Sequence, residues 1–350
     1  MKKNEFYKVY NFENTGRRIF SYFLFLFFSN LVFSQGDFQL DSLLIKYKLK
    51  QYSVGETSIL VYKKNDLPKP TIIFITGSGF NPLFVNGDLI YYPFDIYDYG
   101  DQYNFVTLSK PSIPINSDSI SNKYINETYI NSYYLDNDGK VPSGFTKNNN
   151  CTFYTNQYLQ IMKFLNHQKW VKKDNIIVIG HSQGALIAAS IGNKASSISR
   201  LVLMSPGSIY NRFYESTRQI RMNESDRLIK PNNAQAKIDS IDTRYKELLE
   251  NKNDNQKLFD GSTYYSYYSF TSPTLKDKIL KLDQKTLVVY GTASAQDLDC
   301  DYLKIELYNK NKSNVEVMAL PGYDHNYFEN IYNDKGVIID KKFHLGGCNG

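Results

Sequence analysis

The chain has 350 residues, of which 42% are hydrophobic and 22% charged, a balance typical of globular proteins and not of disordered ones. Its formal net charge is +6, but five basic and two acidic residues lie in 1–34, so the remainder carries only +3. Because this excess is small and no basic stripe is interleaved with aromatic residues, the composition argues against nucleic acid or an anionic membrane surface as a partner.

The first 34 residues have the pattern of an export signal. Arg17 and Arg18 precede an almost wholly apolar run, Ile19–Phe33, which is followed by small and polar residues. About 15 apolar residues are fewer than the roughly 20 that a membrane-spanning helix needs. We therefore predict a signal peptide that is cleaved after Ser34 and an exported protein (periplasmic, cell-surface or extracellular). The alternative is an uncleaved anchor, the one case in which the chain would contact a membrane.

From residue 58 onward, strand-like and helix-like segments alternate, which predicts an α/β protein with a mainly parallel central sheet and helices on both faces. The predicted strands are Ser58–Tyr62, Thr71–Thr76, Phe105–Leu108, Asn175–Ile179, Leu201–Met204, Thr286–Tyr290 and Val315–Leu320. The predicted helices are Tyr158–Leu165, Gly184–Gly192, Ala234–Glu250 and Tyr302–Tyr308. The β-branched runs at Thr71–Thr76 and Asn175–Ile179 are typical of strands that are buried on both faces.

Two long stretches interrupt this alternation. Residues 77–157 are rich in Asn, Ser and Tyr, and we expect part of them to form irregular loops over the sheet. Residues 208–283 are too long for a simple crossover, so we predict an inserted cap within one domain that spans 35–350. Aromatic residues gather at 264–270, where they either line a pocket or pack the cap onto the sheet.

Residues 180–184 have the sequence Gly-His-Ser-Gln-Gly, which matches the G-x-S-x-G pattern of a nucleophile elbow. In such an elbow a very sharp turn between a strand and a helix projects the serine hydroxyl above the sheet. Gly180 and Gly184 lack Cβ atoms, so strand and helix can approach closely around Ser182. The pattern is short, but a buried-type strand precedes it and a small-residue helix follows it, as an elbow requires. The alternative is a serine in an ordinary turn between strand and helix.

On these residues the chain resembles the α/β-hydrolase superfamily, over roughly residues 58–330. The resemblance implies a catalytic triad in the chain order Ser, acid, His, with Ser182 as the nucleophile. His325 follows the last predicted strand, where the family's base lies. The other histidines fit less well: His167 precedes the serine, His181 lies inside the elbow, and His344 lies in a tail with no predicted strand before it.

The resemblance places the triad acid in the loop after Thr286–Tyr290, where this chain has three aspartates. Many relatives carry the acid near the position of Ser294. Asp297 is nearest to that position and is the predicted acid, with Asp299 as the second candidate. Asp301 is interpreted as the cap of the following helix.

The resemblance also implies two backbone N–H groups that stabilise an oxyanion. One belongs to Gln183, and the other comes from the turn 77–80, with Phe80 as first choice and Gly79 as second. The predicted function is a serine hydrolase that cleaves a carboxylic ester, thioester or amide of a small-molecule or peptide substrate, without a metal or organic cofactor. The alternatives are an acyltransferase or peptidase of the same fold, a non-catalytic binding protein, or a membrane-anchored structural protein.

The chain has three cysteines, Cys151, Cys300 and Cys348, whose spacing matches no metal site. If the protein is exported, one disulfide is permitted, and Cys300 with Cys348 is the candidate pair. The alternative is three unpaired thiols without a function.

Overall fold

The computed structural model describes residues 40–54, 57–89, 95–117, 121–125, 129–136, 138–334 and 336–343. All of them belong to one compact unit, Leu40–Gly350. The predicted signal peptide, His344 and Cys348 lie outside the described residues, so export and the disulfide stay predictions. In the part of the chain that is described, no helix is long and apolar enough to cross a membrane.

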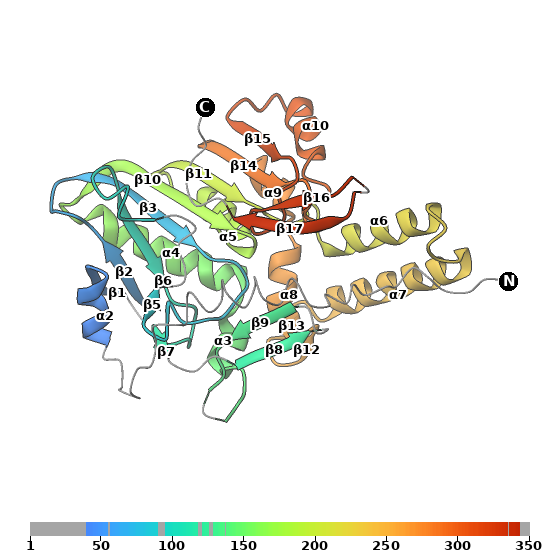
Figure 1. Ribbon diagram of the computed structural model, residues 1–350, viewed down its shortest axis with the longest axis horizontal. Coiled ribbons are helices and arrows are strands. Elements are labelled where there is room, and N and C mark those ends of the chain that lie inside the picture. Colours follow the sequence, from blue (N-terminus) through green and yellow to red (C-terminus); the bar gives the residue numbers. More distant parts are fainter. Residues whose placement is uncertain are drawn as a thin grey trace. The chain divides into compact units, whose positions relative to one another are not determined.

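An eight-stranded sheet forms the centre of the unit, in the order β1-β2-β6-β3-β10-β11-β14-β15 (Figure 1). These strands are β1 (Leu49–Val54), β2 (Thr57–Tyr62), β6 (Asn104–Leu108), β3 (Lys69–Ile75), β10 (Val171–His181), β11 (Ile198–Met204), β14 (Lys285–Gly291) and β15 (Val315–Leu320). β2 is antiparallel to both of its neighbours, whereas all other neighbours pair in parallel. The predicted mainly parallel sheet is therefore confirmed.

The central strand β10 is longer than its apolar run predicts. It begins at Val171, and three charged, exposed residues follow before the buried run starts at Ile176. Pairing with β3 is irregular between Val171 and Ile176, and Asp174 has a positive φ of 55°. Because these first residues are charged, a pattern of apolar residues cannot predict the start of β10.

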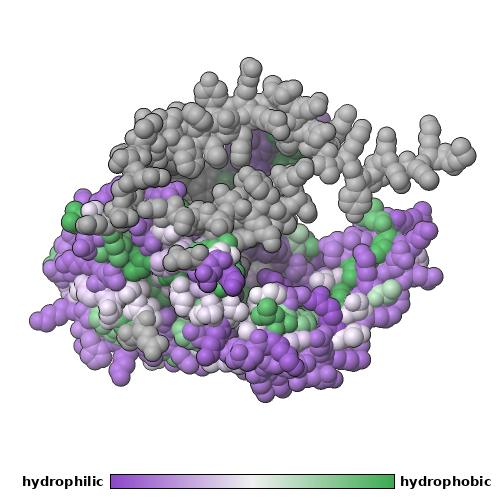
Figure 2. All heavy atoms as spheres, turned by 90° about the horizontal axis from the view of Figure 1, so that it is seen from below, coloured by the Kyte–Doolittle hydropathy of each residue, from purple (hydrophilic) through white to green (hydrophobic). Residues whose placement is uncertain are grey.

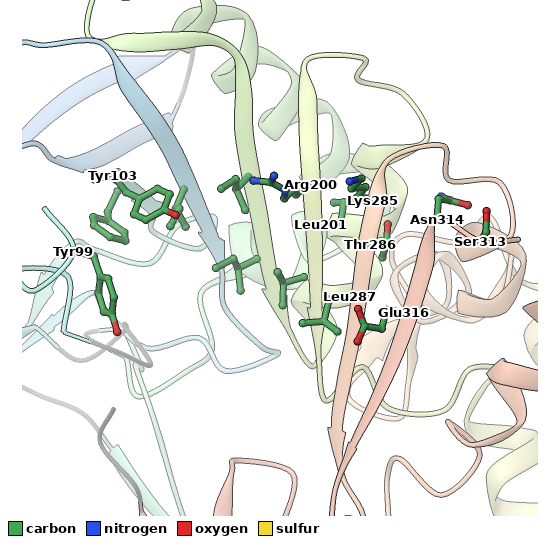
Figure 3. A pocket seen from close by; sticks show the side chains of 15 residues that line it. Tyr99, Tyr103, Arg200, Leu201, Lys285, Thr286, Leu287, Ser313, Asn314 and Glu316 are labelled. Atoms are coloured by element: carbon green, nitrogen blue, oxygen red, sulfur yellow. The ribbon is translucent and has the colours of Figure 1, made fainter. Parts of the chain in front are cut away.

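Alternate residues along the strands face two separate cores, as the pleat of a sheet requires. On one face, Ile73 and Val178 pack with α4 (Cys151–Asn166), α5 (Gln183–Gly192), α9 (Leu275–Ile279) and α10 (Tyr302–Asn309). On the other face, Ile72 and Ile177 pack with α2 (Leu40–Lys46) and with loop residues such as Leu83. A cavity of about 860 Å³ lies over strand residues of this second face (Figure 3).

The segment between β11 and β14 forms a largely helical insertion. Its elements are α6 (Arg212–Ser225), α7 (Pro231–Glu250), β12 (Leu258–Phe259), β13 (Ser262–Thr263), α8 (Tyr264–Thr271) and α9. α6 and α7 lie side by side, and α7 also contacts α8 (Figure 1). The predicted helix Ala234–Glu250 is the main part of α7, which begins earlier because proline is favourable at the first helical position.

The aromatic residues at 264–270 have two different roles. Tyr264 packs with Leu248 and Phe259 in a small third core inside the insertion, and Tyr268 lies against this core. Phe270 instead packs against the core that α4 and α5 form with one face of the sheet. On the face that Figure 2 shows, the described surface is mainly hydrophilic, with apolar residues scattered among polar ones.

The stretch 77–157 contains short elements between its loops. These are β4 (Phe84–Val85), β5 (Asp88–Leu89), β7 (Asn116–Ser117), β8 (Ser121–Ile125), β9 (Tyr129–Tyr133) and α3 (Ser143–Asn148). α4 begins at Cys151, seven residues before the predicted helix. Its N-cap is Asn150, whose side chain accepts a hydrogen bond from the Phe153 N–H.

After β15 the chain forms a hairpin of β16 (Phe328–Tyr332) and β17 (Ile338–Phe343). β17 ends directly before His344, so the expectation that no strand precedes this histidine is wrong. The physical reason is the composition of β17, in which two adjacent isoleucines precede three charged residues. Such a strand lacks the apolar–polar alternation by which a half-buried strand is predicted.

We expect Asn150→Ala to lower the free energy of unfolding by about 1 kcal/mol, because α4 loses its N-cap acceptor. Asn150→Asp should retain most of the stability, since aspartate accepts the same hydrogen bond. Urea unfolding of the three proteins checks this prediction. Equal losses in the two variants would contradict it.

Candidate active site

Ser182 lies at the sharp turn between β10 and α5. Its backbone has φ 54° and ψ −121°, a conformation that residues with a side chain rarely adopt. A serine at the N-cap position normally caps its own helix, but the Ser182 side chain makes no such hydrogen bond. Its hydroxyl is therefore free to face another group.

Missing Cβ atoms make this turn possible. A Cβ on Gly180 would lie 2.2 Å from the Gly184 carbonyl oxygen, and one on Gly184 would lie 2.2 Å from the Ile75 carbonyl oxygen. A Cβ on Gly77 would lie 3.3 Å from the Cβ of Ser182. The end of β3, the elbow and the start of α5 thus approach more closely than larger residues would permit.

The structure brings Ser182, His325 and Asp297 together in one hydrogen-bonded chain. The Nε2 of His325 lies 3.0 Å from the Ser182 Oγ, and its Nδ1 lies 3.0 Å from the Asp297 Oδ2. An ionised carboxylate only accepts hydrogen bonds, so Nδ1–H donates to Asp297 and Nε2 accepts from the serine hydroxyl. The Asp297 side chain is fully buried, whereas that of His325 is 15% exposed.

The loop after β14 explains why Asp297 reaches the histidine. Consecutive turns coil this loop: the Asp297 N–H donates to the Ser294 carbonyl, and the Cys300 N–H donates to the Asp297 carbonyl. A residue three positions after Ser294 is thereby carried to His325. The second oxygen of Asp297 accepts from the Gly207 N–H at 2.7 Å, so both carboxylate oxygens are used.

The other two aspartates of the loop have different partners. Asp299 accepts from the Ser208 hydroxyl at 2.5 Å and from the Ile209 N–H at 3.0 Å. Asp301 precedes α10, but its side chain makes no capping bond and accepts from the Tyr290 hydroxyl. The prediction that the Asp301 side chain caps the helix is therefore wrong. Its carboxylate instead accepts the hydrogen bond of the buried Tyr290 hydroxyl.

His181 helps to hold the backbone of His325 in place. Its Nε2 donates to the His325 carbonyl oxygen at 3.0 Å. Burial lowers the pKa of His181, although the hydrogen bond to His325 partly offsets this effect. The neutral ring therefore carries its proton on Nε2. The sequence assigned this residue no task, because a backbone contact 144 positions away leaves no local pattern.

A cavity of about 640 Å³ opens beside Ser182. Gln183 and Phe80, the two predicted oxyanion donors, line it together with Ser182, whereas Gly79 does not. Gln183 is the first residue of α5, where the N–H groups of a helix have no intrahelical acceptor. Among the described residues, no three His, Cys, Asp or Glu side chains are grouped to hold a metal ion.

Lys110 is a buried lysine next to this site, and it belongs to no motif of the sequence. Its Nζ donates to the Gln183 Oε1 at 3.4 Å and lies 4.6 Å from the centre of the Tyr154 ring. Burial lowers the pKa of Lys110 to about 7. The residue thus positions the side chain of Gln183, and no signal in the loop around Lys110 predicts this contact.

We expect Gly184→Ala to destabilise the protein by about 3 kcal/mol, because the added Cβ meets backbone that cannot move aside. Gly192→Ala is the matched comparison on the same helix, since its Cβ would meet only the side-chain ends of Leu201 and Leu282. Thermal or urea unfolding measures both variants. If Gly184→Ala lowered the free energy of unfolding no more than Gly192→Ala, this would contradict the close approach of α5 to the end of β3.

Lys110→Met should stabilise the protein most at and below pH 7. Because the folded pKa of Lys110 lies below the unfolded value of 10.5, the unfolded chain binds more protons between about pH 7 and 10.5, and wild-type stability rises there. The advantage of the methionine variant should therefore shrink, by on the order of 1–3 kcal/mol, between about pH 6.5 and 9.5. Urea unfolding at both pH values tests this. Lys172→Met, at an exposed position of β10, is the control, and a pH-independent difference for Lys110→Met would contradict the prediction.

Comparisons with known proteins give similarity to solved structures only. No family model and no curated protein matches the sequence. Est1E from Butyrivibrio proteoclasticus, with ferulic acid bound, has a TM-score of 0.47 at 13% identity, and the match covers 79% of this chain and 91% of that one. The α/β-hydrolase GrgF from Penicillium sp. sh18 has a TM-score of 0.46 at 10% identity, with 79% and 90% covered.

Dipeptidyl peptidase 4 from Porphyromonas gingivalis has a TM-score of 0.45 at 10% identity. The match covers 79% of this chain but only 32% of the peptidase, so the chain spans about a third of that protein's length. At these identities the likeness concerns the fold alone. Since the strained serine turn joins a parallel strand to a helix, and serine, aspartate and histidine follow in that chain order, the protein has the α/β-hydrolase fold that its sequence predicts.

Proposed function

We propose that the protein is a serine hydrolase that cleaves a carboxylic ester, thioester or amide through an acyl-enzyme on Ser182. The observation that carries this proposal is the unbroken hydrogen-bonded chain from Ser182 through His325 to Asp297. A serine hydroxyl is a weak nucleophile unless a base takes its proton, and the base needs an orienting group behind it. Here His325 and Asp297 are in the positions of that base and orienting group, and Ser182 lines a cavity.

In the proposed reaction, the Ser182 oxygen attacks the carbonyl carbon while His325 takes its proton. Asp297 holds the imidazole in the tautomer that accepts at Nε2 and stabilises the imidazolium that forms. The N–H groups of Gln183 and Phe80 stabilise the oxyanion of the tetrahedral intermediate. His325 then protonates the leaving group, and water, activated by the same histidine, releases the acyl group from Ser182.

We expect the protein to hydrolyse p-nitrophenyl acetate or butyrate and to react with a fluorophosphonate probe. Ser182→Ala and His325→Ala should each lower kcat/KM by about 10³-fold or more, because they remove the nucleophile and its base. Probe labelling should disappear in Ser182→Ala. A folded wild-type protein that is inert toward both esters and the probe would overturn the proposal and favour a binding protein.

Asp297→Asn and Asp299→Asn form a matched pair for the triad acid, since both replace a buried carboxylate of the same loop. Only Asp297 contacts His325, so Asp297→Asn should lower kcat by about 10³–10⁴-fold through the wrong histidine tautomer. The decrease in kcat caused by Asp299→Asn should be at least about tenfold smaller, because this change affects only the start of the insertion. The reverse order would assign the acid role to Asp299.

A further inference from the structure

Part of the cavity beside Ser182 is lined by the insertion. The first residues of α6 and the turn between β12 and β13 contribute its ionisable side chains, which are Arg212, Glu215 and Asp260. These charges decide what kind of substrate group can bind in the cavity together with a carbonyl group at Ser182.

Arg212 is the permanent positive charge among them. It forms no ion pair with a carboxylate of the described residues. Arg212 is exposed and lies beside Tyr267 on the cavity wall. Burial raises the pKa of Tyr267, and the charge of Arg212 and a hydrogen bond from its side chain partly offset this shift. A guanidinium presents a planar fork of N–H donors that matches a carboxylate.

The position of Arg212 in its helix is also unfavourable for a cation. It is the first residue of α6, where the helix dipole is positive and a positive side chain destabilises the helix. The start of α5, which carries Gln183, faces the same cavity. The start of α5 and an arginine that forms no ion pair among the described residues together favour an anion in this cavity.

The two acidic residues of the cavity offset this charge only in part. Asp260 forms an ion pair with Arg244 of α7, so its charge is compensated. Burial, together with the nearby Asp299, raises the pKa of Glu215 to about 7 although the charge of Arg212 opposes this shift, so about half of its carboxyl groups are neutral at this pH. The positive charge of Arg212 therefore prevails in the cavity near neutral pH.

We propose that the substrate carries a carboxylate, which binds to Arg212 while the scissile carbonyl lies at Ser182. This inference rests on the proposed hydrolase function and names its substrate class: an ester, thioester or amide whose acyl part ends in a carboxylate. The carboxylate accepts hydrogen bonds from the guanidinium, and the chain between the two carbonyl groups occupies the cavity.

Two measurements test the proposal. The first compares kcat/KM for mono-p-nitrophenyl esters of adipate, pimelate and suberate with that for the corresponding methyl p-nitrophenyl diesters. The wild type should prefer at least one anionic ester by about tenfold or more, the gain expected from a charge-assisted hydrogen bond. Arg212→Gln should abolish this preference. Arg218→Gln, on the same helix but over the Tyr302 ring and outside the cavity, should keep both activities and the preference unchanged.

The second measurement does not depend on catalysis. Calorimetry with the Ser182→Ala protein should detect binding of the monomethyl esters of the same diacids, at least about tenfold tighter than of the dimethyl esters, and Ser182→Ala/Arg212→Gln should lose this difference. Carboxylate binding through Arg212 without ester hydrolysis by the wild type would support the site and refute the hydrolase. Hydrolysis without a preference that depends on Arg212 would support the hydrolase and refute the carboxylate site.

Discussion

The sharp turn at Ser182 is the constraint on which the rest of the site depends. A serine with φ 54° is strained, and such a conformation persists only where the surroundings enforce it. Here β10 is fixed on both sides by parallel neighbours, and the Ser182 N–H donates to the Met204 carbonyl at the end of β11. The strain turns the hydroxyl away from its capping position and toward His325, where it forms the hydrogen bond on which the proposed nucleophilic attack depends.

The parts that the sequence predicts are those with local causes. The β-branched residues of β3 and β10 predict buried strands, and Gly180 and Gly184 predict the elbow, because close approach there requires glycine at fixed spacing. The starts of α4 and β10 were missed, since a polar cap and a charged strand start carry no apolar signal.

The parts that the sequence leaves open depend on how distant segments meet. Asp297 and Asp299 have similar local surroundings in the chain, and only the coiled loop after β14 turns one of them toward His325. Lys110 and Arg212 lie about 70 and 30 residues from the serine in sequence, and neither belongs to a pattern around it. Such residues contribute to the site through tertiary contacts, which propensity and periodicity do not encode.

The paired aspartates also tie the insertion to the catalytic arrangement. Asp297 accepts from the Gly207 N–H, and Asp299 accepts from Ser208 and from the Ile209 N–H, directly before α6. Buried carboxylates are costly unless each is hydrogen-bonded, so these contacts stabilise the loop and the start of the insertion together. Because the same carboxylate of Asp297 also hydrogen-bonds His325, a shift of Gly207 would disturb the orientation of the proposed base.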